Sequence, residues 1–227
     1  MSEPTAAGAS LRNAAILTAF VLVFTTLMAV TYRATLPAIR ASAEEEKLKL
    51  VGEVLPAARY DNALLSDWVD IAPRAELGLA AQDDPVRLYR ARLAGAPAAL
   101  VFEAVAPDGY SGRIRLILAV GADNRLIGVR VVSHKETPGL GDYIDPKKDR
   151  NKAAPWIRQF DATGFAEVAA ADWKVKKDGG RFDARAGATI SARAVTNATR
   201  RALQFAVEQR DRLYALPAQS GFGKDDQ

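Results

Sequence analysis

The sequence predicts an α+β protein in which one N-terminal transmembrane helix precedes a domain with an antiparallel sheet and flanking helices. Three observations support this fold class: an uncharged apolar run between Arg12 and Arg33, four short β-type runs between residues 86 and 132, and an amphipathic pattern near the C-terminus. The chain has 227 residues, enough for an anchor and one domain with its own core. Hydrophobic residues make up 49% and charged residues 26%, which is typical of a folded globular protein.

The first element is the apolar run Asn13–Tyr32, which contains no charged side chain. As a helix it would rise about 30 Å, the thickness of the hydrocarbon core of a bilayer. Residues 13–32 are therefore predicted to be a transmembrane helix that follows a short cytoplasmic tail, residues 1–12. A cleaved signal peptide is the alternative, because Ala41-Ser42-Ala43 resembles a cleavage site. The basic residues that flank the run are too evenly divided to orient it. The tail is expected on the cytoplasmic side because a very short tail before a large domain is more easily explained if the domain is exported.

The next elements are a connecting helix and the sheet of the domain. Residues 33–58 are predicted to contain a connecting helix that Pro56 ends, and the domain then covers residues 59–217. Because the links between the β-type runs are short and rich in turn residues, the sheet is predicted to be an antiparallel meander. Its expected strands are Val86–Leu93, Ala99–Val105, Ile114–Val120 and Leu126–Val132.

Beyond the sheet, the chain is rich in loops before one long final helix. We expect a short helix at Ala154–Phe160 and a strand at Trp173–Val175. The long helix is predicted at Ala192–Leu213, where apolar and charged residues fall on opposite faces. Residues 218–227 are expected to be a disordered tail.

The composition excludes several classes of chemistry. The chain has no cysteine, which rules out cysteine-ligated iron–sulfur clusters, disulfides and thioether-attached haem. Its single histidine, His134, argues against a histidine-rich metal site, and no metal ligand set is assigned. A net charge of +4 without a dense basic run gives no indication of nucleic-acid binding. No nucleophile motif is present, so no catalytic residue is expected.

The stretch Gly187-Ala188-Thr189-Ile190-Ser191, which precedes the long helix, is the most informative in the chain. Its small residues leave the backbone open to close approach by another group, and Ser191 is a suitable N-cap. A helix N-terminus also favours a nearby phosphate, so a phosphorylated ligand on Thr189 would be stabilised there. A capped helix with a merely exposed threonine is the alternative.

Three loops carry residues that would complete a binding site. In Glu136–Asp142, a Pro-Gly pair predicts a type II turn, which would present Leu140 and backbone N–H groups to a flat aromatic ligand. The connection Ala106–Gly112 carries Tyr110, which would stack on such a ligand. The lysines of Lys176–Gly180 would neutralise a phosphate. Each loop can also be interpreted as an ordinary surface turn.

Taken in this order, the anchor, these loops and the Gly-Ala-Thr stretch resemble the G subunit of the Rnf-type ion-translocating electron-transport complex, which contains an FMN-binding domain. The resemblance covers nearly the whole chain and includes Leu55–Asn62 and Trp173–Gly180. It implies that a flavin transferase, with FAD as donor, joins FMN to Thr189 through a phosphoester bond. Asp183 matches the acidic position that opens the attachment motif. One departure is Ala186, where the family usually has Ser or Thr.

The resemblance also implies a set of cofactor contacts and a cellular setting. Besides Thr189, the candidate FMN-binding residues are Tyr110, Ser111, Glu136, Thr137, Gly139, Leu140, Gly141, Lys177, Asp183, Gly187, Ala188 and Ser191. The protein would be a single-pass protein of the bacterial inner membrane with its domain on the periplasmic side. Its partners would be the other membrane and peripheral subunits of a complex that moves electrons between ferredoxin and NAD and translocates Na⁺ or H⁺.

Two other functions remain open at this point. One is the related FMN subunit of a Na⁺-translocating NADH:quinone reductase, which differs in its electron donor. The other is a cofactor-free scaffold subunit of such a complex. A scaffold would retain its function when Thr189 is replaced, whereas a flavin carrier would not.

Overall fold

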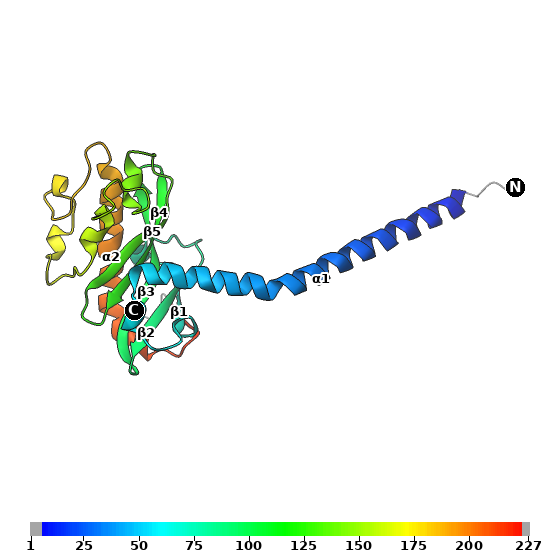
Figure 1. The fold of residues 1–227 in the computed structure, drawn as a ribbon, viewed down its shortest axis with the longest axis horizontal. Coiled ribbons are helices and arrows are strands. Elements are labelled where there is room, and N and C mark those ends of the chain that lie inside the picture. The colour runs from blue at the N-terminus through cyan, green and yellow to red at the C-terminus, as the bar shows by residue number, and fades with distance from the viewer. Residues whose placement is uncertain (1–5, 224–227) are drawn as a thin grey trace. The chain divides into compact units, whose positions relative to one another are not determined.

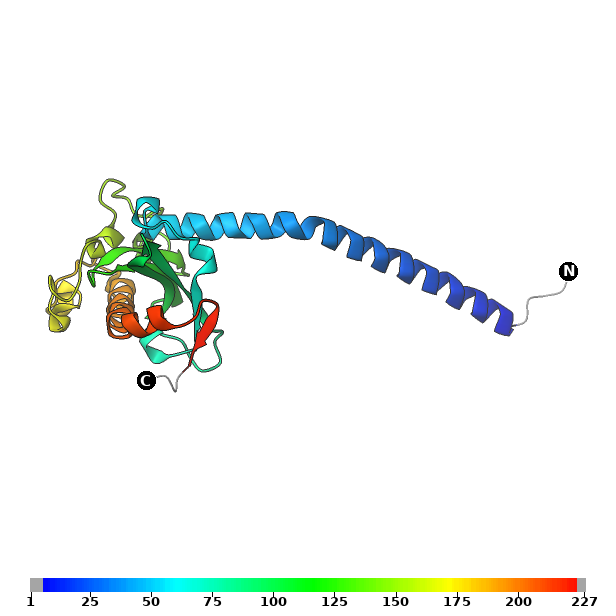
Figure 2. The same ribbon diagram turned by 90° about the horizontal axis from the view of Figure 1, so that it is seen from below.

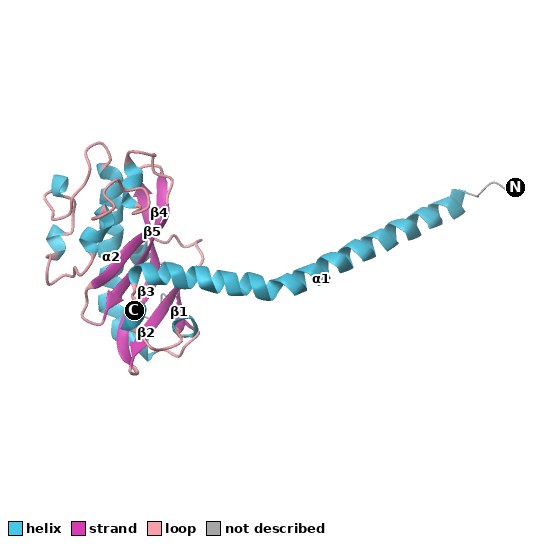
Figure 3. Cartoon of the chain, viewed as in Figure 1, coloured by secondary structure: helices cyan, strands magenta, loops and turns pink. Residues whose placement is uncertain are grey.

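The computed structural model describes residues 6–223, which fall into two units, one ending at Lys47 and one beginning at Leu48. A single helix, α1 (Ala6–Val54), runs through the boundary between them (Figure 3). Its segment Ser10–Leu36 is long and apolar enough to span a membrane. The predicted transmembrane and connecting helices are thus one continuous helix, which also includes part of the expected N-terminal tail. Residues 1–5 of that tail lie outside the described residues.

The connecting helix ends just before Pro56, as predicted. α1 stops at Val54, and Ala57–Arg59 form a separate 3-10 turn after Pro56. Proline cannot continue an α-helix because it lacks the N–H donor and clashes with the preceding turn. Val51 and Val54, in the last turns of α1, are buried in the second unit, so its core begins within the helix.

The domain is built on a six-stranded sheet with the order β5-β4-β3-β2-β1-β6. The strands are β1 (Trp68–Ile71), β2 (Val86–Leu93), β3 (Ala96–Gly109), β4 (Gly112–Gly121), β5 (Leu126–Ser133) and β6 (Ser220–Phe222). The pairs β2–β3, β3–β4 and β4–β5 are all antiparallel, which confirms the predicted meander. Two short strands, β1 and β6, extend the sheet beyond it.

The second of these strands corrects the prediction of a disordered tail for residues 218–227. β6, the red arrow in Figure 2, pairs in parallel with β1, and Phe222 is only 2% exposed. The ring of Phe222 packs edge-on against Phe205 at 6.3 Å, so apolar burial holds the chain here. The last four residues of the predicted tail, 224–227, lie outside the described residues.

The long helix α2 (Thr189–Ala215) lies against one face of the sheet (Figure 1). Alternate residues of β3, including Phe102 and Ala104, point into the core that the sheet shares with α2, as the two-residue period of a strand requires. Phe102 meets Phe205 of the helix edge to face at 6.1 Å. The opposite face of the sheet packs against the end of α1 through a second apolar cluster.

The segment between the sheet and α2 consists of loops and 3-10 turns. The helix expected at Ala154–Phe160 is a 3-10 helix that begins at Trp156, after Pro155. The strand expected at Trp173–Val175 is absent; Val175 makes one isolated bridge with Phe182. The side chain of Trp173 instead packs among other aromatic rings at centroid distances between 4.8 and 6.4 Å. Aromatic packing, rather than a ladder of backbone hydrogen bonds, orders this region.

Candidate functional site

A surface cavity of about 240 Å³ lies where the tip of the β3–β4 hairpin, the loop after β5 and the N-terminus of α2 meet. Three of its lining side chains are large, apolar and exposed: Tyr110 by 66%, Leu140 by 54% and Ile190 by 43%. The lining residues are Tyr110, Glu136, Thr137, Leu140, Gly141, Gly187, Ala188, Ile190 and Ser191. Exposed apolar groups around a concave site are typical of a place where a ligand binds.

The loop after β5 forms the predicted type II turn. The N–H of Leu140 donates to the carbonyl of Thr137 at 3.1 Å, and Gly139 has a φ of 76°, as the third position of this turn requires. The N–H of Gly139 donates to Asp142 Oδ1 at 3.0 Å. Gly139 does not line the cavity itself, but its conformation presents Leu140 to it.

Glu136 joins the three segments that form the cavity. Its side chain is buried, and its Oε1 accepts a hydrogen bond from the N–H of Ser111 at 3.1 Å. Its Oε2 accepts a short hydrogen bond from the hydroxyl of Ser191. Ser111 therefore reaches the site through its backbone, and one carboxylate fixes the hairpin tip, the loop and the helix relative to one another.

Gly141 is packed too closely against this carboxylate to carry a side chain. A Cβ at this position would lie 2.6 Å from Ser191 Oγ and 2.8 Å from Glu136 Oε2. We therefore expect Gly141→Ala to separate these two groups and to destabilise the domain by about 1–3 kcal/mol. Urea unfolding of the full chain in detergent, followed by tryptophan fluorescence, measures this change. Gly221→Ala is the control, because its Cβ would meet nothing closer than 3.9 Å; equal stability of the two variants would contradict the expectation.

The N-terminus of α2 differs from the prediction in one respect. The helix begins at Thr189 with Ala188 at the N-cap position, and no side chain caps it. Ser191, predicted as the N-cap, lies inside the first turn, where its hydroxyl bonds Glu136 instead. Thr189 is half-buried and lies between two residues that line the cavity, Ala188 and Ile190. An uncapped first turn leaves backbone N–H groups available to an anion.

The segment that leads to Thr189 is held by buried aromatic side chains. The indole N–H of Trp156 donates to the carbonyl of Asp183 at 2.7 Å. The hydroxyl of Tyr143 accepts from the N–H of Arg185 at 3.1 Å and donates to the carbonyl of Ala188 at 3.4 Å. Burial raises the pKa of Tyr143, so its hydroxyl keeps its proton as a donor.

An ion pair adds to this anchoring. The Arg185 guanidinium pairs with the buried carboxylate of Asp149 and lies 4.5 Å from the centroid of the Tyr143 ring. Sequence reasoning missed Tyr143, Asp149 and Arg185, and it did not place Ile190 in the lining. Ile190 offered a signal, an apolar side chain in a stretch of small and polar residues; Asp149 lies in an ordinary charged loop and offered none.

Five predicted contacts are not among the residues that line the cavity: Thr189, Ser111 and Gly139, which adjoin lining residues, and Asp183 and Lys177. The Asp183 side chain is 68% exposed and pairs with Lys176 Nζ at 2.6 Å. Lys177 is exposed on the separate 3-10 turn Lys176–Asp178. That turn is tied to the first turns of α2, since Arg193 donates to Asp178 at 2.6 Å.

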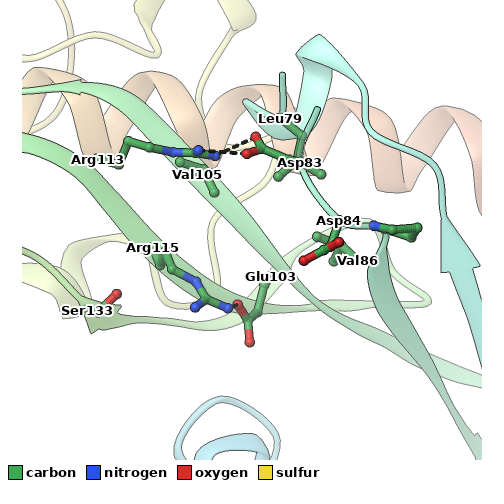
Figure 4. A pocket seen from close by; sticks show the side chains of 10 residues that line it. Leu79, Asp83, Asp84, Val86, Glu103, Val105, Arg113, Arg115 and Ser133 are labelled. Atoms are coloured by element: carbon green, nitrogen blue, oxygen red, sulfur yellow. Dashed lines mark hydrogen bonds and ion pairs between the residues drawn. The ribbon is translucent and has the colours of Figure 1, made fainter. Parts of the chain in front are cut away.

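A second cavity, of about 410 Å³, is lined by ten residues, and four of these are charged groups that pair with one another (Figure 4). Arg113 donates two hydrogen bonds to Asp83, at 2.8 and 2.6 Å, and Arg115 donates to Glu103 at 2.5 Å. Hydrogen bonds from Arg113 and from the N–H of Ala80 lower the pKa of Asp83 to about 2. This second cavity contains none of the candidate residues. Within residues 6–223 no group of three or more potential metal ligands comes together.

Comparison with known proteins identifies the domain that contains the first cavity. Residues 109–204 match the FMN-binding domain, a range that includes every residue of the cavity lining, and residues 1–54 match the RnfG N-terminal region.

Relatives named as the G subunit of an ion-translocating oxidoreductase complex match nearly the whole chain. The protein from Pseudomonas aeruginosa is 44% identical over 93% of this chain and 95% of its own length. The protein from Pseudoalteromonas atlantica is 38% identical over 90% of this chain and 91% of its own length. The protein from Vibrio cholerae is 36% identical over 91% of this chain and 94% of its own length. The chain therefore belongs to the G-subunit family of the ion-translocating oxidoreductase complex, and it contains that family's FMN-binding domain.

Proposed function

We propose that this chain carries FMN covalently on Thr189 and relays electrons within an Rnf-type complex that couples ferredoxin and NAD chemistry to Na⁺ or H⁺ translocation. One observation carries the proposal: a cavity lined by exposed apolar side chains opens directly beside Thr189, at the uncapped N-terminus of α2. The apolar lining suits a flat ring, and the helix terminus suits a phosphate.

The residues present fit this cofactor. A Cβ at Gly187 or Gly139 would meet no atom within 4 Å, so open space lies beside both glycines. Tyr110, Leu140 and Ile190 would contact the faces of the ring, and backbone groups near Thr137 and Gly141 would bond its polar edges. The backbone N–H groups of the first turn of α2 would bond the phosphate.

Thr189 would act as the acceptor during maturation. Its hydroxyl oxygen would form the new P–O bond to the FMN phosphate of FAD, the pyrophosphate bond would break, and AMP would leave; the hydroxyl proton would pass to the flavin transferase. Asp183 is exposed on the approach to this site, where the transferase could contact it without entering the cavity. Once bound, FMN supplies the redox chemistry, while the protein supplies position and electrostatics.

The same proposal includes a membrane arrangement. Residues 13–32 would cross the bacterial inner membrane once, residues 1–12 would face the cytoplasm, and the domain, residues 59–217, would lie in the periplasm. The match of residues 1–54 to the RnfG N-terminal region supports a retained anchor over a cleaved signal peptide. It also favours an Rnf-type complex over a Na⁺-translocating NADH:quinone reductase. Other subunits of the complex and the flavin transferase would be its partners.

Covalent attachment is tested on a denaturing gel. The full chain, produced with an active flavin transferase, should give a band with flavin fluorescence, because a phosphoester bond survives denaturation. Thr189→Val, which lacks the acceptor oxygen but keeps the size of the side chain, should lose the fluorescence completely. Thr189→Ser is the matched control and should retain it. A dark wild-type band, beside a fluorescent control substrate of the transferase, would contradict the proposal and favour the scaffold function.

A further inference from the structure

Glu136 links the three segments of the site, and it also places a negative charge in the wall of the cavity. Its side chain lines the cavity, yet the residue is only 4% exposed. Both carboxylate oxygens accept hydrogen bonds, one from the N–H of Ser111 and one from the Ser191 hydroxyl. Accepting at both oxygens is the behaviour of an ionised carboxylate. Neither donor is a cation, so no bonded positive charge neutralises it.

This charge would act on a flavin held in the cavity. Reduction adds two electrons and one or two protons to the ring, so the reduced form is more negative than the oxidised form until the second proton binds. A buried carboxylate repels the added negative charge, and the repulsion is screened less than it would be at an exposed position. The oxidised flavin is therefore favoured, which corresponds to a lower midpoint potential.

We propose that Glu136 is the residue that lowers the midpoint potential of the FMN on Thr189, and that Ser111 and Ser191 hold its charge in place. This inference rests on the proposed function. A low potential suits a carrier that works at the potential of ferredoxin. The backbone encloses the carboxylate closely, since a Cβ at Gly109 would lie 2.9 Å from Oε1 and a Cβ at Gly141 would lie 2.8 Å from Oε2. The carboxylate therefore lies close to the backbone of both loops, in space that only glycine at these positions leaves open.

The test is a spectroelectrochemical titration, with dithionite as reductant, of the full flavinylated chain in detergent. Glu136→Gln removes the charge and keeps the shape. We expect its reduction equilibrium to shift at least tenfold towards the reduced flavin, which is about 30 mV upward for a two-electron couple. Glu208→Gln, at an exposed position on α2, is the matched control and should titrate like the wild type.

A second pair of variants separates charge from packing. Ser191→Ala removes one hydrogen bond and keeps the carboxylate, so its upward shift should be clearly smaller than that of Glu136→Gln. Glu136→Ala combined with Ser191→Ala removes the charge without leaving the hydroxyl unpaired, and should reproduce the upward shift even where Glu136→Gln takes up no flavin. Equal potentials in all flavinylated variants, or the full shift in Ser191→Ala alone, would overturn the inference. A wild-type chain without flavin would instead overturn the proposed function.

Discussion

Replacing Asp149 with alanine is expected to lower the free energy of unfolding of the domain by about 3 kcal/mol. The carboxylate is fully buried and accepts hydrogen bonds from the backbone N–H groups of Trp156 at 2.7 Å and Asn151 at 2.9 Å. Its removal leaves both groups unpaired, and it also frees the Arg185 guanidinium. Because the Arg185 side chain is 39% exposed, water can solvate the guanidinium after it loses its carboxylate partner. Most of the lost free energy of unfolding therefore comes from the two unpaired N–H groups.

The same substitution is expected to reduce flavinylation. Arg185 lies in the segment between Asp183 and Thr189, and its pairing with Asp149 holds that segment against the Tyr143 ring. Urea unfolding of the full chain in detergent measures stability, and in-gel fluorescence measures the flavinylated fraction. Asp211→Ala is the control, since that side chain is 91% exposed and should change neither quantity. Wild-type stability of Asp149→Ala would show that the ion pair does not anchor the segment.

Lowering the pH should weaken the stabilisation that the Asp149 carboxylate provides. Burial raises the pKa of Asp149, but the N–H groups of Trp156 and Asn151 and the Arg185 guanidinium lower it by more, so it lies below its ordinary value. A depressed pKa means that the carboxylate stabilises the fold above about pH 4 and that this contribution is lost as pH falls through the folded-state pKa. From about pH 5 down to the acid limit, Asp149→Asn should therefore lose less stability than the wild type, as urea unfolding at each pH would measure.

Phe160→Ala is expected to have the largest effect on stability, about 4 kcal/mol. Phe160 is fully buried, and its ring lies 4.7 Å from Phe182, 5.5 Å from Trp156 and 6.4 Å from Trp173. Truncation leaves a cavity among rings that cannot close over it, because each of them is fixed by its own packing. A loss of this size is a large fraction of the total free energy of unfolding of a typical domain.

The measurement is again urea unfolding, with tryptophan fluorescence as the signal. Phe160 contacts two of the three tryptophans in the chain, so the emission of the folded variant should also change. Leu93→Ala, at a position that is 47% exposed, is the control and should stay within about 0.5 kcal/mol of the wild type. A loss below about 1 kcal/mol in Phe160→Ala, against the usual cost of such truncations, would show that the aromatic cluster does not stabilise the domain.

The parts of the fold that the sequence predicted depend on local signals. The meander followed from β-type runs with short turn-rich links, the type II turn from a Pro-Gly pair, and α2 from one apolar face. The strands β1 and β6 could not be predicted in this way. They are four and three residues long, and they pair Val69 with Ser220, so neither alternation nor a nearby turn marks them.

In the site, too, the features set by local sequence were predictable and the long-range contacts were not. Its three loops were predicted separately from their residue types, and the fold brings two of them, the hairpin tip and the loop after β5, around one cavity with the start of α2. What joins them was not predictable, because the bond from Ser191 to Glu136 spans 55 positions and the pair of Arg185 with Asp149 spans 36. Ser191 was assigned to the N-cap on local preference. Its bond to a buried carboxylate is worth more than a cap, and α2 begins at Thr189 instead.

Electron relay through Thr189 is the central claim, and the ferredoxin:NAD oxidoreductase activity of membranes that contain the assembled complex tests it most directly. Wild-type, Thr189→Ser and Thr189→Val chains would be compared at equal amounts of every subunit. We predict that activity is retained with Ser, which keeps the acceptor oxygen, and lost with Val. Full activity in the Thr189→Val complex would contradict this claim and would show that the chain serves the complex without carrying a flavin.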